Sequence, residues 1–283
     1  MEFILPDFTL VGVWMSLLTL TFLEIVLGID NIIFISIAAG KLPESERPRA
    51  TNIGLILAMG MRIALLFGIS VLVAMKAPWF YIGDSDSLIR GGFSGQSLIL
   101  IAGGLFLLYK STTEIHHKLE GSQHGGDLSA QKRNKQVTLS NAILQITLIN
   151  IVFSFDSILT AVGMTSGLTG AMVIMVIAVV VSVLIMMLFA VPVGSFVNKH
   201  PTIQMLGLAF LILIGFMLIA EGAHLAHLSI ADTEIGVVPK GYLYFAIAFS
   251  LFVEFLNLRL RRRPAEPVQL HGIQQQAKEE GIL

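Results

Sequence analysis

Glu24-Ile-Val-Leu-Gly-Ile-Asp30-Asn31 and Asn150-Ile-Val-Phe-Ser-Phe-Asp156-Ser157 are two acidic stretches set inside long apolar sequence. A shift of 126 positions places Asp156 on Asp30, and it also matches the flanking polar residues, Asn31 with Ser157 and Glu24 with Asn150. A charged side chain at the centre of a membrane helix costs about 2.5–3.5 kcal/mol on insertion scales, so such residues are rare and usually functional. Two matching stretches therefore predict a membrane protein with an ion or solute pathway.

The composition also indicates a membrane protein. Of 283 residues, 55% are hydrophobic and only 13% are charged, and the mean hydropathy is +0.82, whereas a soluble domain carries about 25% charged residues. The chain has no cysteine, which excludes a disulfide framework and a thiolate metal site.

Seven apolar stretches are long enough to cross a bilayer core, which takes roughly 20 helical residues each. We expect spans at Val11–Gly40, Thr51–Met75, Ser97–Thr113, Val137–Met164, Ala171–Pro192, Ile203–Ala220 and Gly241–Leu258. A soluble helical bundle would show charged faces opposite its apolar stripes, and these stretches do not. The N-terminus lacks a basic region before the first span, so no cleavable signal is expected. The predicted fold class is an all-α, polytopic membrane protein.

Loop charges predict the orientation. With the N-terminus outside and the C-terminus in the cytosol, 14 Lys and Arg residues fall on the inner side and three, Lys76, Arg90 and Lys240, on the outer side. Cytoplasmic loops carry an excess of positive charge, so this is the favoured topology. Trp79, Phe80 and Tyr81 then lie where aromatic residues gather at the outer interface.

The matching stretches lie in spans one and four, which run in opposite directions, so the chain is predicted to be a 3+3 inverted repeat with a seventh helix added. A weaker Glu-x-x-His match supports this, at Glu114–His117 and Glu221–His224. Chance similarity between apolar helices is the alternative. The expected organisation is a membrane domain over 1–258 and a basic, then disordered, cytosolic tail over 259–283. Within the membrane domain we expect a first repeat (11–113), a cytosolic loop (114–136), a second repeat (137–220) and a seventh helix (241–258).

The polar residues of the two stretches are oxygen donors. Carboxylate and amide oxygens suit Mg²⁺, Ca²⁺ and Mn²⁺, whereas soft sulfur ligands select copper or zinc. The candidate ligands of a divalent cation are Asp30, Asp156, Glu24, Asn31, Ser157 and Asn150. These residues do not separate Mn²⁺ from Mg²⁺ or Ca²⁺. The cation is expected as cargo, and no prosthetic cofactor is expected.

Arg62 is a second charge at the middle of a predicted span, and we expect it to pair with one of the carboxylates. Glu24, Asp30 and Asp156 together with Arg62 leave a net charge of −2 if all are ionised, which a divalent cation would neutralise. The alternative is that one or two acids are protonated when the site is empty, because burial disfavours their charged form. The two readings combine into a hypothesis of cation/proton exchange.

Helical geometry adds a prediction about the backbone. Glu24, Gly28 and Asn31 share one helix face at spacings of four and three residues, while Asp30 lies about 100° off that stripe around the axis. All these oxygens converge on one ion only if the helix unwinds, which we expect at Gly28 and at Ser154. Alternatively, Asp30 faces Arg62 and never touches the cation.

Residues outside the two stretches are secondary candidates. Glu221, Glu114 and Glu254 are expected as accessory groups along a pathway. A weak outer metal site could be formed by His224, His227, Asp232 and Glu234. The basic cluster at 259–263 suits anchoring at the inner leaflet and not nucleic acid. The expected partners are the lipid bilayer, the cation, and either a second copy or other membrane proteins.

The strings Leu23–Asn31, Asn150–Ser157, Gly215–Gly222 and Phe252–Asn257 resemble the TerC family of integral membrane proteins. The resemblance covers nearly the whole chain. It implies seven spans in the cell's inner (plasma) membrane and export of divalent cations, above all Mn²⁺, in a family named for tellurium resistance.

Two other function classes remain open. A small-solute or amino-acid exporter of the related superfamily would use Arg62 to bind a substrate carboxylate. A non-transporting membrane scaffold linked to tellurium resistance would use none of these groups. An enzyme is not expected, because no nucleophile motif such as Gly-x-Ser-x-Gly is present.

Overall fold

The computed structural model describes residues 4–68, 71, 74–83, 87–120, 138–165 and 168–261. For Ile29, Asp30, Asp156 and Arg261 it describes the backbone alone. The chain divides into two compact units, Met1–Tyr244 and Phe245–Leu283.

Seven helices within the described residues are long and apolar enough to cross a membrane. They are α1 (Val11–Ala39), α2 (Arg47–Phe67), α4 (Gly95–Glu120), α5 (Leu139–Thr165), α6 (Ala171–Lys199), α7 (Pro201–Leu225) and α8 (Lys240–Arg261). The predicted polytopic helical fold is confirmed.

Proline positions account for two of the helix boundaries that were predicted wrongly. α6 continues through Pro192 to Lys199, because a membrane helix tolerates an internal proline when neighbouring groups satisfy the freed carbonyl. α2 begins at Arg47 and carries Pro48 in its first turn, where the missing N–H costs no hydrogen bond. Three other ends also differ from the prediction: α2 ends at Phe67 and not at Met75, α4 at Glu120 and not at Thr113, and α7 at Leu225 and not at Ala220.

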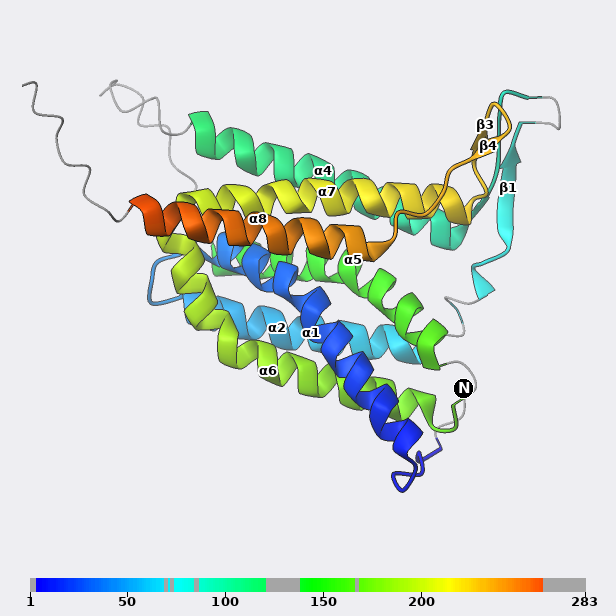
Figure 1. Ribbon diagram of the computed structural model, residues 1–283, viewed down its shortest axis with the longest axis horizontal. Coiled ribbons are helices and arrows are strands. Elements are labelled where there is room, and N and C mark those ends of the chain that lie inside the picture. Colours follow the sequence, from blue (N-terminus) through cyan, green and yellow to red (C-terminus); the bar gives the residue numbers. More distant parts are fainter. Residues whose placement is uncertain are drawn as a thin grey trace, which may run out of the picture. The chain divides into compact units, whose positions relative to one another are not determined.

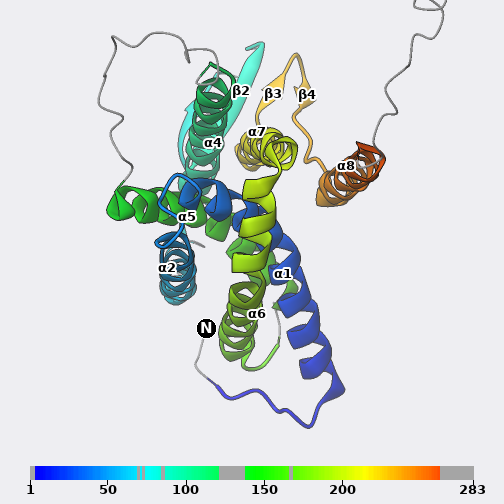
Figure 2. The same ribbon diagram turned by 90° about the vertical axis from the view of Figure 1, so that its left-hand side faces the viewer.

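Figures 1 and 2 show the helices of the first unit. The set of helix pairs that pack together stays nearly the same when the two halves of the sequence are exchanged. The exchange replaces α1, α2 and α4 by α5, α6 and α7, and the reverse. It turns the packed pair α1–α6 into α5–α2 and the pair α1–α7 into α5–α4. All four of these pairs pack together in the structure. The pairs α1–α5, α2–α6 and α4–α7 map onto themselves. One exception is α6–α7, two helices joined directly through His200. An inverted repeat predicts this kind of exchange pattern.

Glycine brings α4 and α7 into close contact. A Cβ atom on Gly104 would lie 2.5 Å from the Gly215 carbonyl oxygen, and one on Gly215 would lie 2.9 Å from the Gly104 carbonyl oxygen. Gly222 meets the Ser97 carbonyl oxygen in the same way. Helix association in a membrane depends on such small residues, since lipid offers no hydrophobic drive between helices.

A small four-stranded sheet joins the helices at one end, hereafter the sheet end, and its strands were not predicted (Figure 1). Its strands are β1 (Pro78–Ile82), β2 (Ile89–Ser94), β3 (Ser229–Ile230) and β4 (Thr233–Glu234), all antiparallel in the order β1-β2-β3-β4. Gly83 has φ of 79° where β1 ends, a conformation that glycine adopts without strain. Trp79, Phe80 and Tyr81, the predicted interfacial aromatics, are exposed on β1.

Several predictions fall outside the described residues. α4 runs to Glu120, and residues 121–137 of the expected cytosolic loop and 262–283 of the expected tail are not described. Glu254 lies on α8 within the second unit.

Candidate functional site

Arg62 connects the two acidic stretches. Its guanidinium forms an ion pair with Glu24 of α1 through Nη1 and Oε2, and its Nε donates a hydrogen bond of 3.4 Å to Ser154 Oγ of α5. The Arg62 and Glu24 side chains are only 5% and 3% exposed. The predicted pairing of Arg62 with a carboxylate is confirmed, and Glu24 is the partner.

The helices that carry the stretches keep a constant register with their neighbours. Along α1 and α6 the contacting pairs Gly28/Met186, Ser36/Gly194 and Gly40/Asn198 are each 158 residues apart, so these helices run in the same direction. Along α2 and α5 the pairs Gly54/Ile146 and Arg62/Ser154 are each 92 residues apart.

These two registers identify a counterpart for Arg62. The 126-residue shift carries Gly28 onto Ser154. Gly28 contacts Met186, and a Cβ on this glycine would collide with Met186 Sδ; Ser154 contacts Arg62. Met186 therefore occupies, beside the first stretch, the place that Arg62 occupies beside the second.

The neutral predicted ligands are all buried, with relative exposures of 4% for Asn31, 4% for Asn150 and 1% for Ser157. Asn150 Nδ2 donates to the Ile146 carbonyl at 2.9 Å, and Ser157 Oγ donates to the Ser154 carbonyl at 3.2 Å. Asn31 Oδ1 has no hydrogen-bond partner within the described part of the chain. Buried polar atoms are nearly always satisfied, so this oxygen is a candidate ligand of something that the site accommodates.

The side chains of Asp30 and Asp156 lie outside the described residues, and their coordination stays a prediction. Their backbones are described, and α1 and α5 are continuous helices through both positions. The predicted unwinding at Gly28 and Ser154 is therefore wrong. The small residues serve close packing instead, against Met186 and Arg62 respectively.

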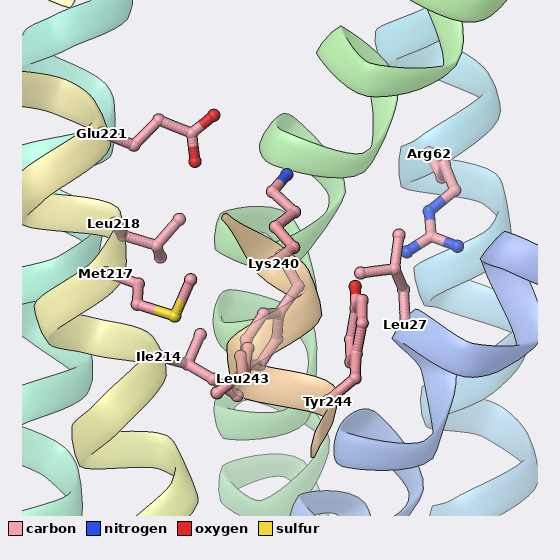
Figure 3. Close-up of a pocket in the computed structure, with 10 residues that line it drawn as sticks. Leu27, Arg62, Ile214, Met217, Leu218, Glu221, Lys240, Leu243 and Tyr244 are labelled. Carbon is pink, nitrogen blue, oxygen red and sulfur yellow. The ribbon is translucent and has the colours of Figure 1, made fainter. Parts of the chain in front are cut away.

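A cavity lies between the two stretches and the ends of α7 and α8 (Figure 3). It has about 530 Å³ of empty volume, part of it open at the mouth. Leu27, Phe153 and Arg62 line the part next to the stretches, and Glu221 and Lys240 contribute the charges from the ends of α7 and α8. Leu27 and Phe153 are themselves related by the 126-residue shift.

The groups around this cavity point into a common space. In Figure 3, the Glu221 carboxylate and the Lys240 ammonium both extend toward its middle, while the Arg62 guanidinium faces Leu27. Lys240 Nζ also donates a hydrogen bond of 3.2 Å to Thr160 Oγ1 of α5. The remaining walls are apolar, from Ile214, Met217, Leu218, Leu243 and the ring of Tyr244.

A second charged cluster lies at the opposite end of the helices. Lys41, just after α1, and Lys110 on α4 place their Nζ atoms 2.5 and 3.0 Å from Glu114 Oε1. Glu114 is 3% exposed. Lys118 donates to Gln204 Oε1, which joins α4 to α7 nearby. The accessory residue Glu114 is thus part of a clamp between α1 and α4, and Glu221 lines the cavity.

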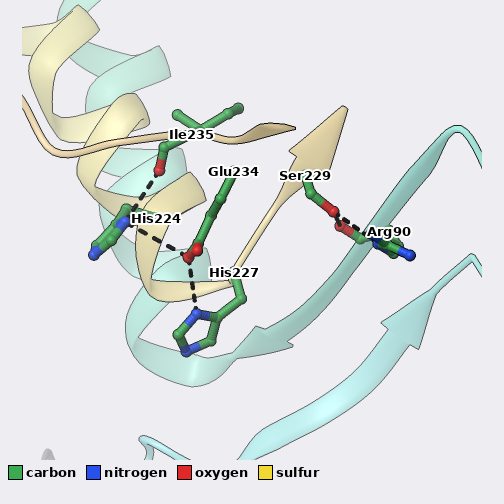
Figure 4. A network of polar contacts seen from close by, with 6 residues as sticks. All are labelled: Arg90, His224, His227, Ser229, Glu234 and Ile235. Carbon is green, nitrogen blue, oxygen red and sulfur yellow. Dashed lines mark hydrogen bonds and ion pairs between the residues drawn. The ribbon is translucent and has the colours of Figure 1, made fainter. Parts of the chain in front are cut away.

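The histidines of the sheet end form a network around Glu234 (Figure 4). His227 Nδ1 lies 2.9 Å from Glu234 Oε1, whereas His224 Nδ1 lies 3.8 Å from it and 3.0 Å from the Ile235 carbonyl oxygen. Asp232 pairs with Arg90 instead. Among the described side chains, no group of three His, Asp or Glu residues could hold a metal ion. The described residues therefore give no support to the outer metal site considered from the sequence.

Sequence reasoning missed two parts of this site. Met186 lies in a featureless apolar span, and only the register of α1 against α6 reveals it. The role of Ser154 as a hydrogen-bond partner of Arg62 was also missed, although its place in the second stretch was a usable signal.

Comparison with known proteins supports the membrane assignment. A UPF0053 protein of Haemophilus influenzae is 43% identical over 249 residues, 88% of this chain and 94% of that protein. The UPF0053 inner membrane protein YgdQ of Escherichia coli K12 is 44% identical over 252 residues, 89% of this chain and 95% of YgdQ. YoaE of the same strain is 41% identical over 262 residues, which are 93% of this chain and 45% of YoaE. No solved structure matches.

With seven membrane-capable helices and relatives named as inner membrane proteins, this is a multi-pass inner membrane protein. The family model of the integral membrane protein TerC family matches residues 11–266. The chain therefore belongs to the TerC family of integral membrane proteins.

Proposed function

We propose that this protein exports divalent metal cations, with Mn²⁺ as the favoured substrate, through a site formed by its two acidic stretches. The observation that carries the proposal is the position of Arg62, one buried guanidinium that contacts Glu24 of the first stretch and Ser154 of the second. It ties the two stretches together, and α1 and α5 also pack directly against each other.

The charges of the site suit a divalent cation. Because Arg62 already neutralises Glu24, the carboxylates left to act are Asp30 and Asp156, with a combined charge of −2 when ionised. Asn31 Oδ1 supplies a further buried oxygen without a hydrogen-bond partner in the described part of the chain. Oxygen ligands of this kind suit Mg²⁺, Ca²⁺ and Mn²⁺. In this proposal Glu24 is a charge-balancing residue, while Asn150 and Ser157 take supporting positions.

The pathway follows from the two ends of the helices. In the predicted orientation the sheet end is outside, so the cavity past Glu221 and Lys240 is the outward route, and the Lys41–Glu114–Lys110 cluster closes the cytosolic side. Glu254 keeps its place as an accessory candidate. In this proposal, the two halves of the inverted repeat, which the helix contacts support, alternate in opening the site to one side of the membrane and to the other. Protons displaced from Asp30 and Asp156 on cation entry give cation/proton exchange.

One observation favours a second candidate, a small-solute or amino-acid exporter. The cavity combines apolar walls with charged groups of both signs, a lining of the kind found in small-molecule sites. However, the Arg62 guanidinium that would bind the substrate carboxylate is already paired with Glu24. This pairing makes cation export the better proposal.

Cell-associated metal measured by mass spectrometry tests the proposal. Cells that lack the gene and are grown in excess manganese should hold several-fold more manganese than cells that carry it. Complementation with the wild type should reverse the excess, and Asp30→Asn or Asp156→Asn should not. Equal manganese content with and without the gene would overturn the proposal.

A further inference from the structure

Lys240 brings a positive charge into the proposed outward route. It is the first residue of α8 and lines the cavity together with Glu221 of α7 and Arg62 of α2. Arg62 is already paired with Glu24, and among the described residues that line this cavity Glu221 is the only acid. A cation that leaves through the cavity therefore meets one carboxylate and one further ammonium, which extend toward the same space (Figure 3).

The Lys240 ammonium is held close to the second acidic stretch. Its Nζ donates a hydrogen bond of 3.2 Å to Thr160 Oγ1 of α5. Thr160 follows Asp156 by four residues, so the two positions share a helix face and are about 6 Å apart along the axis. Lys240 thus reaches across from α8 to within about one helical turn of a position where the cation is proposed to bind.

The folding of α8 gives no reason for a lysine at this position. The N-terminus of a helix carries a partial positive charge, which favours acidic side chains and disfavours cations. α8 nevertheless begins with Lys240 and has no acidic residue in its first turn. An ammonium at this helix end is explained if it acts on a group in the cavity.

The opposite end of the helices shows lysines that neutralise the corresponding acid. Glu114 of α4 matches Glu221 of α7 through the Glu-x-x-His pattern, and α4 and α7 replace each other when the halves are exchanged. Lys41 and Lys110 place their Nζ atoms 2.5 and 3.0 Å from Glu114 Oε1. Lys41 comes from the end of another helix, as Lys240 does beside Glu221. Both glutamates therefore have an ammonium from a neighbouring element at hand.

We propose that Lys240 is a tethered counter-cation for Glu221, which weakens the affinity of the outward-facing cavity for the exported cation. The departing cation displaces the ammonium from Glu221, and the ammonium returns to the carboxylate once the cation has left. A cation outside must then compete with a charged group that is attached to the site and cannot diffuse away. Recapture is therefore weak, while binding from the cytosolic side is unaffected. This inference rests on the proposed function and names the residue that favours release.

Inside-out membrane vesicles test the inference, because their lumen corresponds to the outer side. The assay measures the half-maximal concentration for uptake of radioactive Mn²⁺ from the medium and, separately, for its efflux from the loaded lumen. Competition at one site is a coupling free energy, so Lys240→Gln should lower the half-maximal lumenal concentration by about fivefold or more. The half-maximal concentration for uptake should not change. Lys240→Arg keeps the positive charge and should keep both wild-type values.

Lys76→Gln is the matched control, because Lys76 is an exposed lysine of the predicted outer side that does not line the cavity. This variant should keep both half-maximal concentrations. An unchanged lumenal value in Lys240→Gln, or an equal change on both sides, would overturn the inference. Wild-type vesicles that move no Mn²⁺ in either direction would instead remove the proposed function itself.

A second measurement needs no variant and applies even if Lys240→Gln fails to fold. Purified wild-type protein is acetylated with a water-soluble amine reagent, and the rate at each lysine is followed by mass spectrometry of its peptides. Saturating Mn²⁺ should raise the rate at Lys240, because the cation displaces its ammonium from Glu221, and should leave the rate at Lys76 unchanged. In protein that transports Mn²⁺, an unchanged or lower rate at Lys240 would overturn the inference.

Discussion

The correspondence between the two halves of the chain can be tested by replacing Glu24 and Arg62 with the uncharged residues that occupy the equivalent positions in the second half. Asn150 matches Glu24 by the 126-residue shift, and Met186 matches Arg62 by helix register. The double variant Glu24→Asn/Arg62→Met therefore gives the first half the same uncharged residues that the second half has at these positions. Each single variant removes one charge and leaves the other charged residue without its partner.

The magnitude follows from burial. The Arg62 and Glu24 side chains are only 5% and 3% exposed. Removal of either one leaves the other as an unpaired buried charge, which should lower the free energy of unfolding by about 3–5 kcal/mol. Replacement of both partners by uncharged groups of similar size is often neutral, so the double variant should unfold within about 1 kcal/mol of the wild type. The predicted coupling between the two sites is thus several kcal/mol.

The assay is the melting temperature of detergent-solubilised protein, followed by the fraction that stays monodisperse on size exclusion after heating. At about 2–4 °C per kcal/mol, each single variant should melt roughly 6–20 °C lower, and the double variant should recover most of that loss. A double variant that loses the sum of the two single effects would refute the reasoning, because the residues would then act independently.

Three further predictions concern the helix contacts, the charged clamp and the orientation. Gly104→Leu should lower stability by about 1–3 kcal/mol through overpacking against Gly215, whereas Gly60→Ala, with nothing within 4 Å of a Cβ, should not; similar melting temperatures for both would contradict the tight α4–α7 contact. In this cysteine-free chain, Lys41→Cys/Glu114→Cys should stop cation transport when the two thiols are joined by a bis-maleimide long enough to span the two replaced side chains, and unchanged transport by the crosslinked protein would exclude opening at that clamp. Phe80→Cys should react with an impermeant maleimide on intact spheroplasts and His116→Cys, whose side chain is 60% exposed, only after permeabilisation; the reverse would place the N-terminus in the cytosol.

Hydropathy was sufficient for the helices because the membrane sets a single dominant requirement, about 20 apolar residues for each span. The same signal could not end α6 correctly, since Pro192 sits inside the helix. It could not reveal the sheet either. β3 and β4 are two residues long, and the aromatic residues of β1 suit an interfacial belt as well as a strand.

The candidate site was predicted in part for a comparable reason. A guanidinium within an apolar span needs a carboxylate, so the sequence could predict that Arg62 forms an ion pair. It could not predict that Glu24 is the partner. The contact of Met186 with Gly28 depends on which helices pack side by side and in which register, and no local pattern encodes that. The expected break at Gly28 failed because a small residue in a membrane helix serves close packing as readily as unwinding.

Uptake of radioactive Mn²⁺ into inside-out membrane vesicles tests the central claim most directly. Vesicles with the wild type should accumulate Mn²⁺, and vesicles with Asp30→Asn or Asp156→Asn should not. The Glu24→Asn/Arg62→Met variant, which keeps the −2 charge of the two aspartates, should retain transport. Undiminished uptake with either aspartate replaced would contradict the account.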